Sequence, residues 1–211
     1  MTRTVLTAAL ALAVLMGAGP APLQPAALAA QEAEAPAVVE MTKGDPEAPV
    51  EVIEYASYTC PHCATFHQNV LPQLEEDYID PGKVHFTYRE VYFDKYGMWA
   101  SMIARCGGEE RFFGITDLLY EAQSDWSRAG SDVAVANELR KIGRLAGLGE
   151  ERIEACLNDA DKLRALVGWY QENATEHGIR STPSFVIDGE TYDNMSYADF
   201  SDLLDEKLGE E

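Results

Sequence analysis

The residues best suited to chemistry are two cysteines separated by a proline and a histidine, Cys60-Pro61-His62-Cys63. A strand-like run precedes them and helical spacing follows, so Cys60 is expected at a helix N-terminus. Unpaired backbone N–H groups there stabilise an anion and lower the pKa of a thiol. Pro61 suits the first helical turn, and His62 can donate to the Cys60 sulfur or place positive charge beside it. The motif predicts a nucleophilic Cys60 thiolate, with Cys63 as the resolving thiol.

Two other interpretations of this motif remain open. The pair could be an inert structural disulfide, although such bridges rarely close so small a ring at a helix start. It could also bind copper or zinc with His67, four residues after Cys63, as a third ligand. The sequence offers no clear fourth ligand, and a histidine at this place on a helix is commonly solvated. We therefore expect neither a metal nor an organic cofactor.

The hydrophobic pattern around the motif predicts an α/β protein with many helices. Two runs rich in β-branched and aromatic residues read as strands, and the apolar period then becomes helical over about 80 residues. A late Asp188-Gly189 pair marks a hairpin turn. The predicted elements are a strand at 50–56, a helix at 60–77 kinked at Pro72, a strand at 84–91, helices over about 98–178, a hairpin at 184–192 and a helix capped by Ser196.

Two further cysteines, Cys106 and Cys156, fall on apolar faces of predicted helices. With Cys60 and Cys63 paired, these two would form a structural disulfide within the helical block. Closing a loop of about 50 residues is worth on the order of 4 kcal/mol in the chain-entropy model. The alternative is a pair of buried free thiols. A separation of their Cα atoms beyond about 7 Å would exclude the disulfide.

The N-terminus has the order of a secretory signal peptide. Arg3 is the one charged residue in 1–29, an apolar run occupies 5–16, and Ala27-Leu28-Ala29 offers a cleavage site after helix-breaking glycines and prolines. We expect cleavage near Ala29, a flexible leader at 30–37 and a folded domain at 38–208. Export to the periplasm would place the cysteines where disulfides form and persist.

The composition excludes some classes of function. The 211 residues contain 16 Lys and Arg against 36 Asp and Glu, a formal net charge of −20. Such a charge repels phosphate backbones and anionic membrane surfaces, so no nucleic-acid partner is expected. The length favours one compact domain, and we expect a monomer.

At VIEYASYTCPHC and GIRSTPSFVIDG the chain resembles the DsbA-like branch of the thioredoxin superfamily, over about residues 38–208. The resemblance implies a thioredoxin fold with an all-helical insertion between the second and third core strands. It also implies that Thr182-Pro183 is the cis-proline loop against the active-site cysteines, which binds extended substrate by its backbone. Glu54 matches a buried acid beneath the disulfide, placed to accept the Cys63 proton.

Members of this branch are exported thiol:disulfide oxidoreductases. The resemblance implies that the protein introduces disulfides into reduced or unfolded exported proteins and is reoxidised by a membrane partner of the DsbB type. Many oxidases have valine before the cis-proline, whereas Thr182 is also common in isomerases and reductases. A disulfide reductase or isomerase on the same fold therefore remains the alternative.

Overall fold

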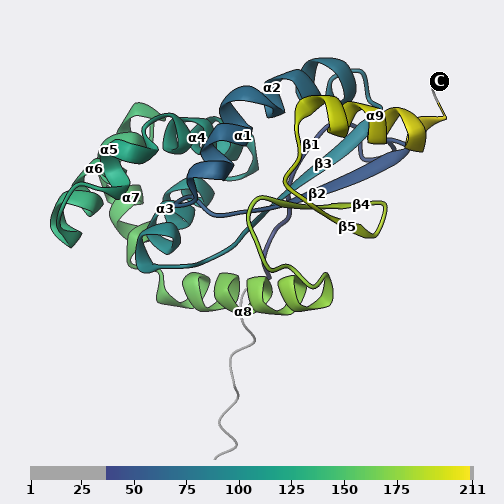
Figure 1. The fold of residues 1–211 in the computed structure, drawn as a ribbon. Helices are drawn as coiled ribbons and strands as arrows, with labels where there is room; N and C mark the ends of the chain where they lie inside the picture. The colour runs from purple at the N-terminus through teal and green to yellow at the C-terminus, as the bar shows by residue number, and fades with distance from the viewer. Residues whose placement is uncertain (1–36, 210–211) are drawn as a thin grey trace, which may run out of the picture. The chain divides into compact units, whose positions relative to one another are not determined.

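The computed structural model describes residues 37–209, so the predicted signal peptide at 1–29 and nearly all of the leader at 30–37 lie outside the described residues. Five strands in the described part form one mixed sheet in the order β1-β3-β2-β4-β5 (Figure 1). They are β1 (Met41–Lys43), β2 (Val50–Ala56), β3 (Val84–Glu90), β4 (Ser184–Ile187) and β5 (Glu190–Asp193).

The parallel pair β2 and β3 lies at the centre of the sheet. Their register runs from Val50 opposite Val84 to Ala56 opposite Glu90, while β4 pairs antiparallel with β2. Every β2 residue except Glu51 is buried, because helices cover both faces of the sheet. The chain leaves the carboxyl end of β2 directly into the cysteine motif.

The predicted strands and hairpin are confirmed, and β1 is an addition to them. This strand of three residues pairs antiparallel with β3, with Met41 opposite Tyr88. Three residues are too few for a period of two to stand out, so only the pairing with β3 defines the strand.

Different helices cover the two faces of the sheet. On one face α1 (Pro61–Asn69) and α9 (Tyr197–Leu208) pack together, and the rings of Phe66, Phe185 and Phe200 meet there. On the other face α8 (Ala160–Glu176) places Ala174 in a cluster with Tyr55 of β2. Figure 1 shows α8 below the sheet, with α1, α2 and α9 above it.

The helix predicted at 60–77 is three segments instead of one kinked helix. After α1 come α2 (Leu71–Leu74) and the π-helix η1 (Glu75–Ile79), with Val70 at the first junction. Pro72 has no backbone N–H and cannot continue the α-helical hydrogen bonding of α1. The break is therefore larger than the predicted kink.

All regular secondary structure in the long connection from β3 to β4 is helical. It contains α3 (Lys95–Cys106), α4 (Glu109–Glu121), α5 (Gln123–Ser127), α6 (Asp132–Leu145), α7 (Glu150–Leu157) and α8. The side chains of Asp94, Ser131 and Asp159 cap α3, α6 and α8. Phe112, Leu119 and Trp126 are fully buried inside the block. The predicted fold class, a thioredoxin fold with an all-helical insertion between the second and third core strands, is confirmed.

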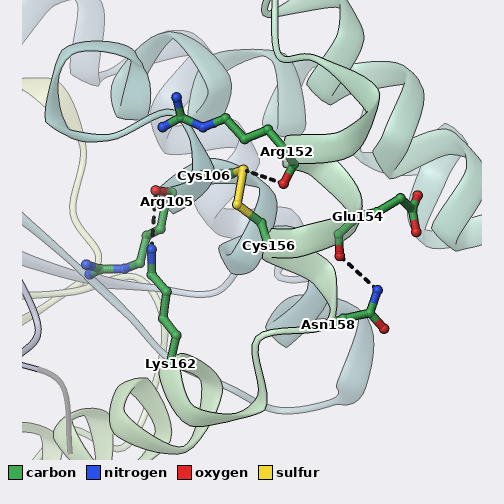
Figure 2. Close-up of a disulfide and its surroundings, with 7 residues drawn as sticks. All are labelled: Arg105, Cys106, Arg152, Glu154, Cys156, Asn158 and Lys162. Atoms are coloured by element: carbon green, nitrogen blue, oxygen red, sulfur yellow. Dashed lines mark hydrogen bonds between the residues drawn. A yellow bond between two sulfur atoms is a disulfide. The ribbon is translucent and has the colours of Figure 1, made fainter.

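A disulfide joins α3 to α7 inside the insertion (Figure 2). It links Cys106 to Cys156, whose Cα atoms lie 5.8 Å apart. The neighbouring Arg105 forms a buried ion pair with Glu90 of β3, with Nε 2.6 Å from Oε1 and Nη2 2.6 Å from Oε2. The disulfide therefore ties the insertion together, and the ion pair ties its first helix to the sheet.

Candidate active site

Cys60 occupies the N-cap position of α1, with extended backbone angles and Pro61 at the start of the helix. The loop before it is fixed by hydrogen bonds from outside the motif. Gln123 of α5 donates through Nε2 to the carbonyl oxygens of Tyr58, at 2.8 Å, and Cys60, at 2.9 Å. The Thr59 hydroxyl donates to Asp94 Oδ2 at 2.8 Å. The insertion thus holds the loop that presents Cys60.

The environment of Cys60 stabilises its thiolate. A hydrogen bond from the Cys63 thiol is the largest cause that lowers the pKa of Cys60 to about 5, against the opposing effect of burial. The Thr182 side chain and the backbone N–H groups of Cys63 and His62 lower it further. The His62 side chain is exposed, so the interaction found here comes from its backbone, not from the imidazole that the sequence suggested.

Cys63 lies in the opposite environment. Its side chain is fully buried, and burial raises the pKa of the Cys63 thiol. The hydrogen bond to Cys60 and the negative charge of Glu54 raise that pKa further. Both residues are free cysteines in this structure. The site therefore contains one thiol that ionises readily and one that holds its proton.

Titration of Cys60 gives a direct test of this environment. The ultraviolet absorbance of the thiolate in the reduced protein should rise with a midpoint near pH 5, well below the ordinary value of 9. Because the folded-state pKa is lowered, the ionisation stabilises the reduced fold fully above pH 9, and this stabilisation is lost as the pH falls towards 5. A Cys60→Ser variant supplies the baseline, and a midpoint near 9 would contradict the described environment.

The Thr182-Pro183 loop faces the reactive sulfur. The peptide bond between these two residues is cis, and the Cys60 Sγ atom lies 3.3 Å from the Thr182 carbonyl oxygen, to which the protonated thiol can donate. The loop leads directly into β4, and the Ser184 hydroxyl anchors it by donating to the Ser181 carbonyl oxygen at 2.8 Å. The fold thus brings together Cys60 and Thr182, which are 122 residues apart.

Glu54 and His67 form a buried pair on the sheet side of α1. The His67 Nε2 atom lies 2.8 Å from Glu54 Oε2, and both side chains are at most 1 % exposed. The place of His67 on the helix suggested a solvated side chain. That prediction is wrong, because the side chain is buried. His67 is also not assembled with Cys60 and Cys63 as a copper or zinc site, because within residues 37–209 no group of three or more His, Cys, Asp or Glu side chains has that arrangement.

Sequence reasoning missed two residues that support the site, Gln123 and Asp94. Asp94 precedes a helical pattern, so its role as the α3 N-cap could have been predicted. Asp94 also accepts a hydrogen bond from Thr59, and Gln123 donates two to the loop before Cys60. These bonds depend on the packing of the insertion against that loop, so they leave no local signal in the sequence.

Comparison with known proteins agrees with this fold. A family model described as Thioredoxin matches residues 37–206, and the chain belongs to the thioredoxin family, in its DsbA-like branch. The solved structure of alpha-DsbA1 from Wolbachia pipientis is 29% identical with a TM-score of 0.73, and the match covers 82% of this chain and 93% of that one. No helix within residues 37–209 is long and apolar enough to cross a membrane.

Two relatives found by sequence carry names from redox biology. The Rickettsia prowazekii (strain Madrid E) protein named "Putative protein-disulfide oxidoreductase RP025" is 33% identical over 178 residues, which are 82% of this chain and 62% of that protein. Disulfide bond formation protein D of Bacillus subtilis (strain 168) is 25% identical over 173 residues, 78% of this chain and 75% of that protein. The chain thus spans about three fifths of the length of the rickettsial relative.

Proposed function

We propose that the protein is an exported thiol:disulfide oxidoreductase that introduces disulfides into secreted or periplasmic proteins through Cys60 and Cys63. The observation that carries the proposal is the opposite shift of the two thiols, with the pKa of Cys60 lowered to about 5 and that of Cys63 raised. A Cys60 thiolate at neutral pH stabilises the reduced form of the pair. The oxidised form is therefore readily reduced and acts as an oxidant towards other thiols.

The proposed cycle moves two electrons from a client protein to the enzyme. A client thiolate attacks the Cys60 sulfur, the Cys60–Cys63 bond breaks, and the Cys63 sulfur leaves with the electron pair and takes up a proton. A second client thiolate then attacks the client sulfur of the mixed disulfide and releases Cys60 as a thiolate. The low pKa of Cys60 makes it a good leaving group in this second step.

Thr182 and Pro183 would bind the client beside Cys60. The carbonyl oxygen of Thr182 lies at the Cys60 sulfur, and an extended client chain could pair with this backbone as an added strand. A cavity of about 450 Å³ lies beside His62 of the motif. Its wall contains apolar side chains from Phe66, Val70 and Met195 and polar ones from Thr65, Asn194, Ser196 and Asp199. The apolar part of this wall could contact hydrophobic residues of a client that is still unfolded.

Glu54 would act as the proton acceptor when Cys63 attacks a mixed disulfide during reoxidation of the enzyme. Glu54→Gln keeps the size of the side chain but removes the base, so the Cys63-dependent step should slow by about 10²-fold. Rapid mixing of the reduced protein with glutathione disulfide measures that step. Glu51→Gln is the matched control, since Glu51 lies on the same strand but is exposed. Equal rates in both variants would contradict the role of Glu54.

The proposed export rests on the sequence of residues 1–29, and a membrane protein of the DsbB type would reoxidise the dithiol after each turnover. A stoichiometric assay tests the function itself. The oxidised protein should rapidly form disulfides in a reduced, unfolded client and should reduce insulin poorly. Fast insulin reduction without client oxidation would instead assign the protein to the reductases, the alternative that Thr182 leaves open.

A further inference from the structure

The buried pair of Glu54 and His67 leaves two polar atoms without a partner. Their direct hydrogen bond uses Glu54 Oε2 and His67 Nε2. Within the described residues, Glu54 Oε1 and His67 Nδ1 are buried and have no hydrogen-bond partner. Buried polar atoms of this kind are uncommon, and an unsatisfied one is costly. Each member of the pair thus keeps one free position at which a proton can arrive or leave.

One end of the pair faces Cys63. Cys63 and His67 are four residues apart on α1 and so lie on the same face of the helix, against Glu54 of β2. The charge of Glu54 raises the pKa of the Cys63 thiol, which places the carboxylate within electrostatic reach of the sulfur. Glu54 alone, however, is fully buried and has no direct route to solvent.

The other end of the pair lies at a second cavity. His67 lines this cavity of about 340 Å³ together with Asp117, Glu75 and Glu121. Burial raises the pKa of Asp117, so this carboxyl group holds a proton more readily than an exposed aspartate. The remaining titratable groups against the imidazole are Tyr120 of α4, stacked on it at 4.3 Å, and Tyr88 of β3, edge-on at 5.6 Å.

We propose that His67 is a proton relay that connects Glu54 to this cavity and so carries the Cys63 proton between the buried thiol and solvent. The inference rests on the proposed thiol–disulfide exchange at Cys60 and Cys63. His67 suits the task because an imidazole can accept a proton at one ring nitrogen and release one at the other. It does not touch the reacting sulfur atoms and acts through Glu54, as a positioning and proton-carrying residue.

The proton balance of the relay follows the exchange reaction. When the reduced enzyme is reoxidised, the Cys63 thiol gives its proton to Glu54, and the Cys63 thiolate displaces the leaving thiolate from Cys60. Glu54 then passes one proton to His67, which releases one into the cavity beside Asp117. When the enzyme oxidises a client, the Cys63 sulfur leaves as a thiolate and one proton returns along the same path.

Reoxidation by glutathione disulfide separates the step that needs the relay from the step that does not. In the first step the Cys60 thiolate forms a mixed disulfide and releases one glutathione. In the second, Cys63 loses its proton, attacks Cys60 and releases the other glutathione. Acid quenching followed by mass spectrometry measures the mixed disulfide over time. His67→Gln should slow the second step 10- to 100-fold and leave the first unchanged, within the usual range of general-base effects.

Three comparisons distinguish a relay from a structural role. The second-step rate of His67→Gln should rise steeply with pH, since hydroxide must remove the proton, while the wild-type rate changes little. A Glu54→Gln and His67→Gln double variant should be no slower than Glu54→Gln alone, because the two residues act in series. His85→Gln, at a histidine that contacts the Asp45 carbonyl far along β3, should behave as wild type.

Different failures would have different meanings. An unchanged second step in His67→Gln, or additive losses in the double variant, would overturn the relay while leaving the proposed function in place. Equal slowing of both steps would also overturn it, because His67 would then act only through the structure of α1. Failure of the wild-type protein to form the Cys60 mixed disulfide would instead overturn the proposed function.

Discussion

A Cys60→Ser variant is expected to lose disulfide-forming activity towards a reduced client by about 10³-fold or more, as is typical when a nucleophile is removed. Cys60 has the lowered pKa and faces the Thr182 carbonyl, so it is the sulfur that can exchange with a client. The hydroxyl group of serine cannot form a disulfide. The rate at which the reduced client loses its free thiols measures the effect.

Cys63→Ser is the matched comparison for this prediction. It leaves the Cys60 nucleophile in place but removes the resolving thiol. With a client that already contains a disulfide, Cys60 should attack one client sulfur, release the other as a thiolate, and accumulate as a mixed disulfide. A non-reducing gel detects this covalent complex. Activity of Cys60→Ser near the wild-type rate, or trapping of clients by Cys60→Ser instead of Cys63→Ser, would contradict the assigned roles of the two cysteines.

Removing the disulfide of the insertion is expected to lower the free energy of unfolding by about 4 kcal/mol. Cys106 and Cys156 are 50 residues apart in the chain, and the chain-entropy model gives this value for a loop of that length. The Cys106→Ala and Cys156→Ala double variant should therefore unfold at a clearly lower urea concentration. The slope of the urea dependence should change little if the fold itself is kept.

The control for this measurement separates the two cysteine pairs. In a background with Cys60 and Cys63 both changed to alanine, a reductant acts on the disulfide of the insertion alone. Reduction should destabilise that protein and should have no effect once Cys106 and Cys156 are alanine as well. A loss below about 1 kcal/mol would show that packing of the buried helices, and not the cross-link, holds the insertion together.

Much of the fold was predictable from sequence because the relevant signals are local. The strand at 50–56, the hairpin turn at Asp188-Gly189 and the Ser196 cap each depend on adjacent residues, and the structure has them at those places. The short strand β1 and the break at Val70 were not predicted. Strand β1 is defined only by its pairing with β3. The break at Val70 arises from local packing and from the missing N–H of Pro72.

In the candidate site, too, the local motif was predictable from the sequence and the contacts between distant residues were not. The Cys60 and Cys63 motif is visible in the sequence because its spacing carries the chemistry. The support from Gln123 and the pairing of Glu54 with His67 bring together residues from separate elements. No periodicity or motif records such contacts. The sequence therefore indicated the cysteine pair and Glu54, and the structure added His67 as the partner of Glu54 and Gln123 as a support of the loop before Cys60.

The reduction potential of the Cys60–Cys63 pair tests the central claim most directly. Equilibration of the protein with glutathione buffers, read out by trapping of free thiols, gives the value. The lowered pKa of Cys60 predicts an oxidising potential, between about −120 and −180 mV, as in disulfide-forming proteins of this chemistry. A value near about −270 mV, typical of a reductase, would contradict the proposal that the protein introduces disulfides.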